Sequence, residues 1–144
     1  MVSQGTIALD LDGTTSIFKN GCFYVPSIVT SYLESLHQQG WTIAFITGRS
    51  VNVAKQILTY CRFPYYLSAQ NGSVTLSMPD AKVLNSYYLS KDIIPTLDKA
   101  FASINTDYVV YCGVEFGDRC FFRPQELASI ALDFVTSQQR YYVD

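Results

Sequence analysis

Short apolar runs alternate with amphipathic stretches along the first half of this chain. The apolar runs predict buried strands, and they cover residues 5–10, 41–46 and 65–69. The stretches between them repeat apolar residues every three or four positions, which predicts helices over residues 26–39 and 50–61. Strands that alternate with helices predict right-handed crossovers and a parallel sheet.

Turn-forming residues separate these predicted elements. Gly40 and Pro64 follow the two predicted helices and end them. The first strand is apolar on both faces, as expected for a parallel strand that is covered by helices on both sides. The pair Asn71-Gly72 predicts a hairpin from the third strand into residues 73–77. The first half therefore has the order β-α-β-α-β followed by a hairpin.

The pattern changes near residues 78–80, where Met, Pro and Asp predict a linker. The second half again mixes helix and strand, with helices expected over 90–104 and 124–139 and strands over 108–112 and 120–122. Residues 140–144 resemble the start of a further strand and not a polar tail, so we expect the chain to be a fragment. The predicted fold class is α/β, with a Rossmann-like parallel sheet.

Composition narrows the class of protein. Of the 144 residues, 49% are apolar and only 15% are charged, against roughly 25% charged in a typical globular domain. The net charge of −2 argues against nucleic acid as a partner, and no apolar run approaches the length of a membrane span. Four cysteines without a C-x-x-C pair are typical of reduced thiols in a cytoplasmic protein.

Two carboxylates follow the first strand in the run Asp10-Leu11-Asp12-Gly13-Thr14. Residues two apart on an extended chain point to the same side, and open parallel sheets bind ligands at the carboxyl ends of their strands. Converging carboxylates repel each other unless a cation or a proton joins them. The run therefore predicts a catalytic pair or a metal site, and a simple acidic turn is the alternative.

A second motif, Thr47-Gly48-Arg49, ends the second strand and precedes a helix. A hydroxyl, a glycine amide and a helix N-terminus together favour an anion site. A simple turn with Ser50 as the N-cap is the alternative. The order and spacing of the two motifs favour a shared site at one edge of the sheet.

These two motifs, with the segment Ala69 to Ser73, resemble those of the haloacid dehalogenase (HAD) superfamily of phosphohydrolases. Within it, they look like the Cof-like branch, which has a large cap domain after the third strand. The resemblance rests on motifs over residues 5–77. It implies that residues 1–80 form the first half of a Rossmann-like core and that residues 81–144 form part of an α+β cap.

The resemblance also implies roles for the carboxylates. Asp10 would be the nucleophile that forms an aspartyl-phosphate, and Asp12 would act first as general acid and then as general base. Mg²⁺ would be held by the Asp10 carboxylate and by the backbone carbonyl of Asp12. Thr14 would steady the turn.

Phosphate binding would fall to the second motif and to the turn. Thr47 would donate to a phosphate oxygen, and the backbone amides of Leu11 and Gly48 would lie nearby. Arg49 would brace the loop or line the substrate entrance, and Asn71 would line that entrance.

The implied function is a Mg²⁺-dependent phosphatase that acts on small phosphorylated metabolites such as sugar phosphates. A phosphosugar mutase shares the same nucleophile motif and is one alternative. A non-catalytic regulatory or binding remnant of the fold is another. The high apolar content also predicts a homo-oligomer formed through uncovered core surface.

Two family motifs, a phosphate-binding Lys and a late acidic pair, are not found in the sequence. In the large-cap branch both follow the cap, so we expect residues 81–144 to be the first part of a cap. In a capless alternative, Lys91 would bind phosphate, residues 108–112 would form the fourth strand, and Glu115 or Asp118 would complete the metal shell.

We expect this chain alone to hydrolyse p-nitrophenyl phosphate only very slowly. Electrostatic stabilisation is the largest contribution to phosphoryl transfer, and the missing Lys and late acids would supply part of it. Release of p-nitrophenolate in the presence of Mg²⁺ measures the rate. Robust hydrolysis would contradict this expectation and favour the capless alternative.

Overall fold

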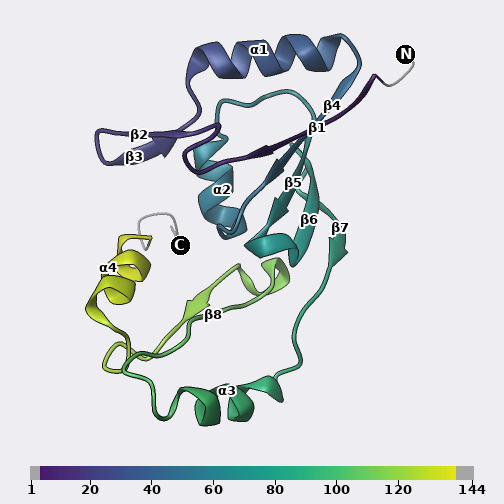
Figure 1. Cartoon of the computed structure of the whole chain (residues 1–144). Coiled ribbons are helices and arrows are strands. Elements are labelled where there is room, and N and C mark those ends of the chain that lie inside the picture. The colour runs from purple at the N-terminus through teal and green to yellow at the C-terminus, as the bar shows by residue number, and fades with distance from the viewer. Residues whose placement is uncertain (1–3, 139–144) are drawn as a thin grey trace. The chain divides into compact units, whose positions relative to one another are not determined.

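A mixed sheet of five strands, in the order β1-β4-β5-β6-β7, is the framework of the first part of the chain (Figure 1). The structure is a computed structural model that describes residues 4–138, and it divides into two units, Met1–Tyr87 and Tyr88–Asp144. The parallel strands are β1 (Gly5–Asp10), β4 (Trp41–Ile46) and β5 (Tyr65–Ala69). This parallel α/β core confirms the predicted fold class.

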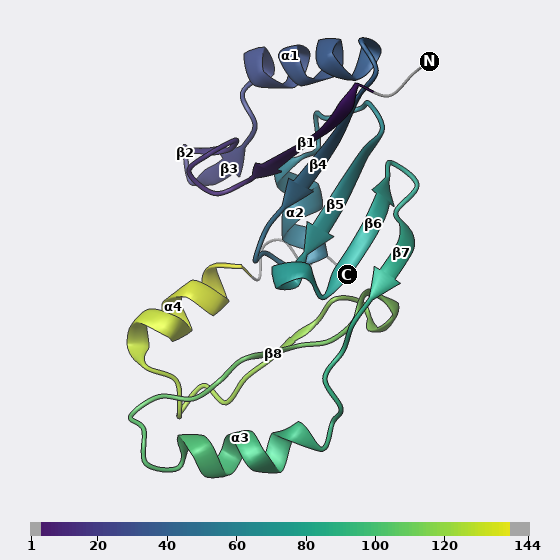
Figure 2. The same ribbon diagram turned by 45° about the vertical axis from the view of Figure 1, so that its right-hand side comes forward.

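Two antiparallel strands extend the sheet beyond β5 (Figure 2). The first, β6 (Val74–Met78), is the predicted hairpin partner of β5. The second, β7 (Lys82–Ser86), pairs with β6. The linker predicted near residues 78–80 is therefore wrong, because the chain turns there and returns to the sheet.

One face of this sheet carries the core. The register pairs Phe45 of β4 with Leu67 of β5, and both side chains are fully buried. The helices α1 (Ser27–Gln38) and α2 (Val51–Ile57) add further buried apolar side chains, most of them from α2. The helix α2 is shorter than the predicted 50–61, because residues 58–60 form a turn.

The other face of the sheet is open, which corrects the prediction that β1 is buried on both sides. Thr6, Ala8 and Asp10 of β1 are all exposed. On the same face Ile46 and Tyr66 are also exposed. Only the alternate residues Gly5, Ile7 and Leu9 of β1 are partly buried, so one face of this strand is covered.

A small hairpin follows β1 and was predicted only as a connector with a turn. Its strands are β2 (Ile17–Lys19) and β3 (Cys22–Tyr24), which pair antiparallel. Asn20 and Gly21 form the turn with φ values of 53° and 79°. Two consecutive positive φ values are typical of the tight turns that join hairpin strands.

The second unit contains α3 (Ile93–Phe101), β8 (Val110–Tyr111), β9 (Cys120–Phe121) and α4 (Ser129–Ser137). The predicted elements are present but shorter, and α4 begins five residues after Pro124. The strands β8 and β9 form a separate antiparallel pair. This pairing contradicts the capless alternative, in which residues 108–112 would join the main sheet. The strand predicted over 140–144 lies outside the described residues.

Two further observations concern the whole described region. All four cysteines carry free thiols, and burial raises the pKa of Cys61 to about 11. Within residues 4–138 the helices are too short and too polar to cross a lipid bilayer.

Alanine substitutions at neighbouring positions of β5 test the two faces of the sheet. Leu67 is 0% exposed, so Leu67→Ala should lower the free energy of unfolding by about 2–5 kcal/mol. Tyr66 is 42% exposed, so Tyr66→Ala should change it by less than about 1 kcal/mol. Urea unfolding followed by the fluorescence of the single tryptophan, Trp41, measures both values. Equal effects at the two positions would contradict the assignment of Leu67 to the buried face and Tyr66 to the exposed face.

Candidate active site

A tight turn follows β1 and closes on the backbone carbonyl of Leu11. The amides of Thr15 and Ser16 donate to this carbonyl over 3.2 and 2.8 Å, and the Ser16 hydroxyl donates to it over 2.8 Å. Gly13 has a φ of +74°, a conformation that residues with a side chain seldom adopt. The turn therefore fixes the backbone between the two carboxylates.

Threonines of the turn hold Asp10 at the end of β1. The Thr14 hydroxyl donates to Asp10 Oδ2 over 3.1 Å, and the Thr15 hydroxyl donates to the Asp10 backbone carbonyl over 2.6 Å. Asp10 itself is exposed. Its carboxylate is thus oriented by one hydrogen bond and stays accessible to a ligand.

Arg49 binds the carboxylate of Asp12. Its Nε donates to both oxygens of Asp12 over 3.0 Å, and its Nη2 donates to Oδ1 over 2.7 Å. The Arg49 side chain is 11% exposed and that of Asp12 is 39% exposed. A guanidinium that holds a carboxylate through two nitrogens fixes both its position and its orientation. The arginine of the second motif therefore braces the acid of the first.

Backbone bonds tie the second motif to the turn that follows β5. The carbonyls of Thr47 and Arg49 accept from the amides of Asn71 and Gln70 over 3.1 and 2.8 Å. A Cβ at Gly48 would lie 2.7 Å from Asn71 Oδ1, which explains why this position needs glycine or a displaced Asn71 side chain. The structure therefore brings Gly48 and Asn71 together.

Thr47 lies inside this motif and is 3% exposed. Its Oγ1 accepts from the Arg49 amide over 3.1 Å. This bond uses a lone pair of the hydroxyl, so the hydroxyl proton can still be donated to an anion. The geometry is compatible with the predicted phosphate contact.

The donor set around Asp10 suits Mg²⁺. This ion prefers oxygen ligands, usually keeps several waters, and is commonly held by one or two carboxylates and by substrate phosphate. An exposed carboxylate on Asp10 and the Asp12 backbone carbonyl offer such oxygens. Within residues 4–138, no group of three or more His, Cys, Asp or Glu side chains forms a preassembled metal site.

The residues of the capless alternative belong to the second unit. Glu115 accepts a hydrogen bond from the Tyr88 hydroxyl over 3.0 Å. Asp118 is 2% exposed and lies in a turn with a φ of 55°. Lys91 is exposed just before α3. None of the three belongs to the unit that holds Asp10.

One residue of the site was not predicted. Phe23 of β3 places its ring 4.5 Å from Arg49 Cζ, so the guanidinium stacks over an aromatic face. An aromatic residue two positions after Asn20-Gly21 was the available signal in the sequence. It was insufficient, because the contact joins residues that are far apart along the chain.

Comparison with known protein families shows which family this chain belongs to. The family profile described as haloacid dehalogenase-like hydrolase matches residues 7–125. The chain belongs to this family. The match covers the carboxylate motif, the Thr47-Gly48-Arg49 motif and most of the second unit.

Several solved structures, some of them described as HAD proteins, share the fold. A protein from Eubacterium rectale has a TM-score of 0.66 at 16% identity, with 96% of this chain and 48% of that chain covered. A phosphatase from Bacteroides thetaiotaomicron has a TM-score of 0.62 at 18% identity, with 78% and 40% covered. A sugar phosphatase of HAD subclass IIB has a TM-score of 0.53 at 17% identity, with 77% and 41% covered.

At these identities the likeness shows the fold alone. The chain spans less than half of the length of each of these three structures. No curated protein sequence matches the chain significantly.

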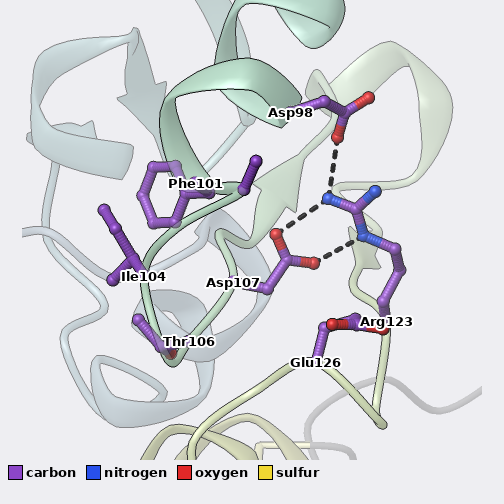
Figure 3. Close-up of a pocket in the computed structure, with 8 residues that line it drawn as sticks. Asp98, Phe101, Ile104, Thr106, Asp107, Arg123 and Glu126 are labelled. Carbon is purple, nitrogen blue, oxygen red and sulfur yellow. Dashed lines mark hydrogen bonds and ion pairs between the residues drawn. The ribbon is translucent and has the colours of Figure 1, made fainter.

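The second unit of this HAD chain contains a pocket of about 220 Å³ beside an ion-pair cluster (Figure 3). Arg123 donates to both oxygens of Asp107 over 2.6 and 2.8 Å and to Asp98 over 2.8 Å. The Tyr108 hydroxyl donates to Asp98 over 2.7 Å, and the Arg123 guanidinium lies 5.1 Å from the Tyr108 ring centre. The charges of this pocket are therefore largely engaged with one another.

The cluster ties α3 to the segments before β8 and after β9, so we interpret it as structural. The hydroxyl of Tyr108 and the guanidinium of Arg123 lower the pKa of Asp98 below its usual value. The guanidinium likewise lowers the pKa of Asp107. A carboxyl whose pKa is lower in the folded state stabilises that state only while it is ionised.

Replacing Arg123 by Met tests this role. The variant should lose stability in the second unit at neutral pH, and its difference from wild type should shrink as the pH falls below about 4, where the carboxyls are protonated in both proteins. Hydrogen exchange of the α3 amides measures the difference, with Arg119→Met as the control because Arg119 is exposed in the same unit. A difference that does not depend on pH would contradict the ion-pair explanation.

Proposed function

We propose that this chain carries the nucleophile half of a Mg²⁺-dependent phosphatase that acts on small phosphorylated metabolites. The observation that carries the proposal is the arrangement after β1, where an exposed carboxylate on Asp10 is followed by a second carboxylate that Arg49 fixes. Family membership supports the same chemistry, because HAD-like hydrolases are typically phosphatases.

Asp10 is the nucleophile in this proposal. One of its oxygens attacks phosphorus, the bond from phosphorus to the leaving oxygen breaks, and an aspartyl-phosphate forms. The bond from the Thr14 hydroxyl to Oδ2 orients the carboxyl group and leaves Oδ1 to attack. The exposure of Asp10 gives a phosphate monoester direct access to it.

Asp12 is the proton donor in the first step and the proton acceptor in the second. In the first step its carboxyl group protonates the leaving oxygen, and in the second step its carboxylate removes a proton from the water that attacks phosphorus. In the structure this carboxyl group is paired with the guanidinium of Arg49. Arg49 keeps this group in one orientation while its proton state changes.

Thr47 and the amides of Leu11 and Gly48 are the proposed phosphate contacts. They lie at the carboxyl ends of β1 and β4, where a parallel sheet binds its ligands. Asp10 and the Asp12 backbone carbonyl would hold Mg²⁺, which neutralises the repulsion between an anionic nucleophile and an anionic phosphate. Arg49 and Asn71 frame the substrate entrance in this proposal.

Sugar phosphates are the proposed substrate class. The fold of this chain is similar to that of a subclass IIB sugar phosphatase, and the order of its elements fits the large-cap Cof-like branch. Of the predicted cap residues 81–144, those after β7 would then be part of the cap, because β7 itself pairs in the core sheet. The complete active site would need the Lys and the late acids of the family.

Chemical trapping of the intermediate tests the proposal without requiring rapid turnover. The chain is incubated with Mg²⁺ and p-nitrophenyl phosphate and then treated with borohydride, which reduces an aspartyl-phosphate to homoserine. Peptide mass spectrometry should find homoserine at position 10, and Asp10→Asn should abolish it. Asp12→Asn should increase the trapped fraction, because p-nitrophenolate leaves without a proton while hydrolysis of the intermediate loses its base.

Asp80→Asn is the matched control, because Asp80 is an exposed aspartate in a turn of the same unit. It should leave the trapped fraction unchanged. Absence of homoserine at position 10 in the wild-type chain, or its persistence in Asp10→Asn, would overturn the proposed nucleophile.

A further inference from the structure

The hairpin of β2 and β3 has an arrangement that the core of the fold does not require. Phe18 and Phe23 are cross-strand partners with ring centres 4.9 Å apart, yet Phe18 is 60% exposed and Phe23 is only partly buried. Side chains that serve the core of this unit are almost fully buried. The two rings therefore have a different use from core packing.

The ring of Phe23 covers one face of the Arg49 guanidinium. Arg49 Cζ lies 4.5 Å from the ring centre, well inside the distance at which a cation is attracted to an aromatic face. The same guanidinium donates three hydrogen bonds to Asp12. A ring on one side removes water from the guanidinium and strengthens its interaction with the carboxylate.

The backbone of Arg49 is fixed as well. Its amide donates to Thr47 Oγ1 and its carbonyl accepts from the Gln70 amide. Only the long side chain can move, and a free arginine side chain has many rotamers. The ring of Phe23 restricts that freedom in the direction that keeps the guanidinium on Asp12.

We propose that Phe23 is a positioning residue for Asp12 and acts through Arg49. The inference rests on the proposed function, because Asp12 is the general acid and base there. The hairpin presents the ring, the ring holds the guanidinium, and the guanidinium fixes the carboxylate. Phe18, the cross-strand partner of Phe23 on β2, contacts the ring of Phe23.

The nuclear magnetic resonance signal of the Arg49 Nε–H group tests the contact directly. In the wild-type chain this proton should be shifted by the ring current of Phe23 and should exchange with water more slowly than the Nε–H of the exposed Arg62. Equal shift and exchange for the two arginines would overturn the proposal without any variant.

Substitutions separate the ring from the rest of the hairpin. Phe23→Leu should remove the ring-current shift and speed the exchange of the Arg49 Nε–H about two- to fivefold, the factor that corresponds to one cation–π contact. Phe23→Tyr should restore both values. Tyr24→Leu removes an aromatic ring from the adjacent position of β3, which faces the other way, and should leave both values unchanged. No change in Phe23→Leu would overturn the proposal.

A second measurement distinguishes a positioning role from a structural one. Hydrolysis of the aspartyl-phosphate before trapping depends on Asp12, whereas its formation from p-nitrophenyl phosphate does not. Phe23→Leu should slow breakdown and leave formation unchanged, and equal breakdown rates in the variant and in wild type would overturn the positioning role. If Asp10 is never phosphorylated but the Arg49 signal responds as expected, the proposed function fails and the contact between Phe23 and Arg49 stands.

Discussion

Arg49 donates three hydrogen bonds to the carboxylate of Asp12, and the arrangement of the candidate site depends on this ion pair. Two carboxylates after one strand repel each other, so a nearby cation is needed to hold the turn in a single geometry. The register of the sheet supplies that cation, because Asp10 of β1 pairs with Ile46 of β4 and the residues that follow them are neighbours. Arg49 is close enough to bind Asp12 because it lies three residues beyond Ile46.

The rest of the first unit positions this pair. The buried face of the sheet, with Phe45 and Leu67 at its centre, fixes the strand ends from which both motifs begin. The turn after β5 binds the backbone of Thr47 and Arg49, and the hairpin after β1 places Phe23 on the guanidinium. The turn after β1 and the hairpin therefore contact the side chain of Arg49, and the turn after β5 binds its backbone. The proposed phosphoryl chemistry uses the carboxylates that these contacts orient.

The sequence predicts the long elements of this fold well and its short ones poorly. The strands β1, β4 and β5 contain five or six residues with clear apolar patterns, and Gly40 and Pro64 mark the ends of the intervening helical regions. The strands of the hairpin have three residues each, too few for a periodic pattern. The strand β7 is exposed along its whole length, so its sequence lacked the apolar alternation that would have indicated pairing with β6. In the site, Asp10 and Asp12 could be found from their spacing, but the partner of Arg49 could not. That contact depends on the strand register and on the reach of a long side chain, which no local pattern records.

A double-mutant cycle on Asp12 and Arg49 tests the central claim most directly. Asp12→Asn, Arg49→Met and the double variant are compared with wild type in urea unfolding, followed by Trp41 fluorescence. The ion pair predicts a coupling free energy of about 1 kcal/mol, the upper end for a pair in which one partner is partly exposed. A coupling free energy near zero would show that the two side chains do not interact, and it would contradict the account of how this site is held together.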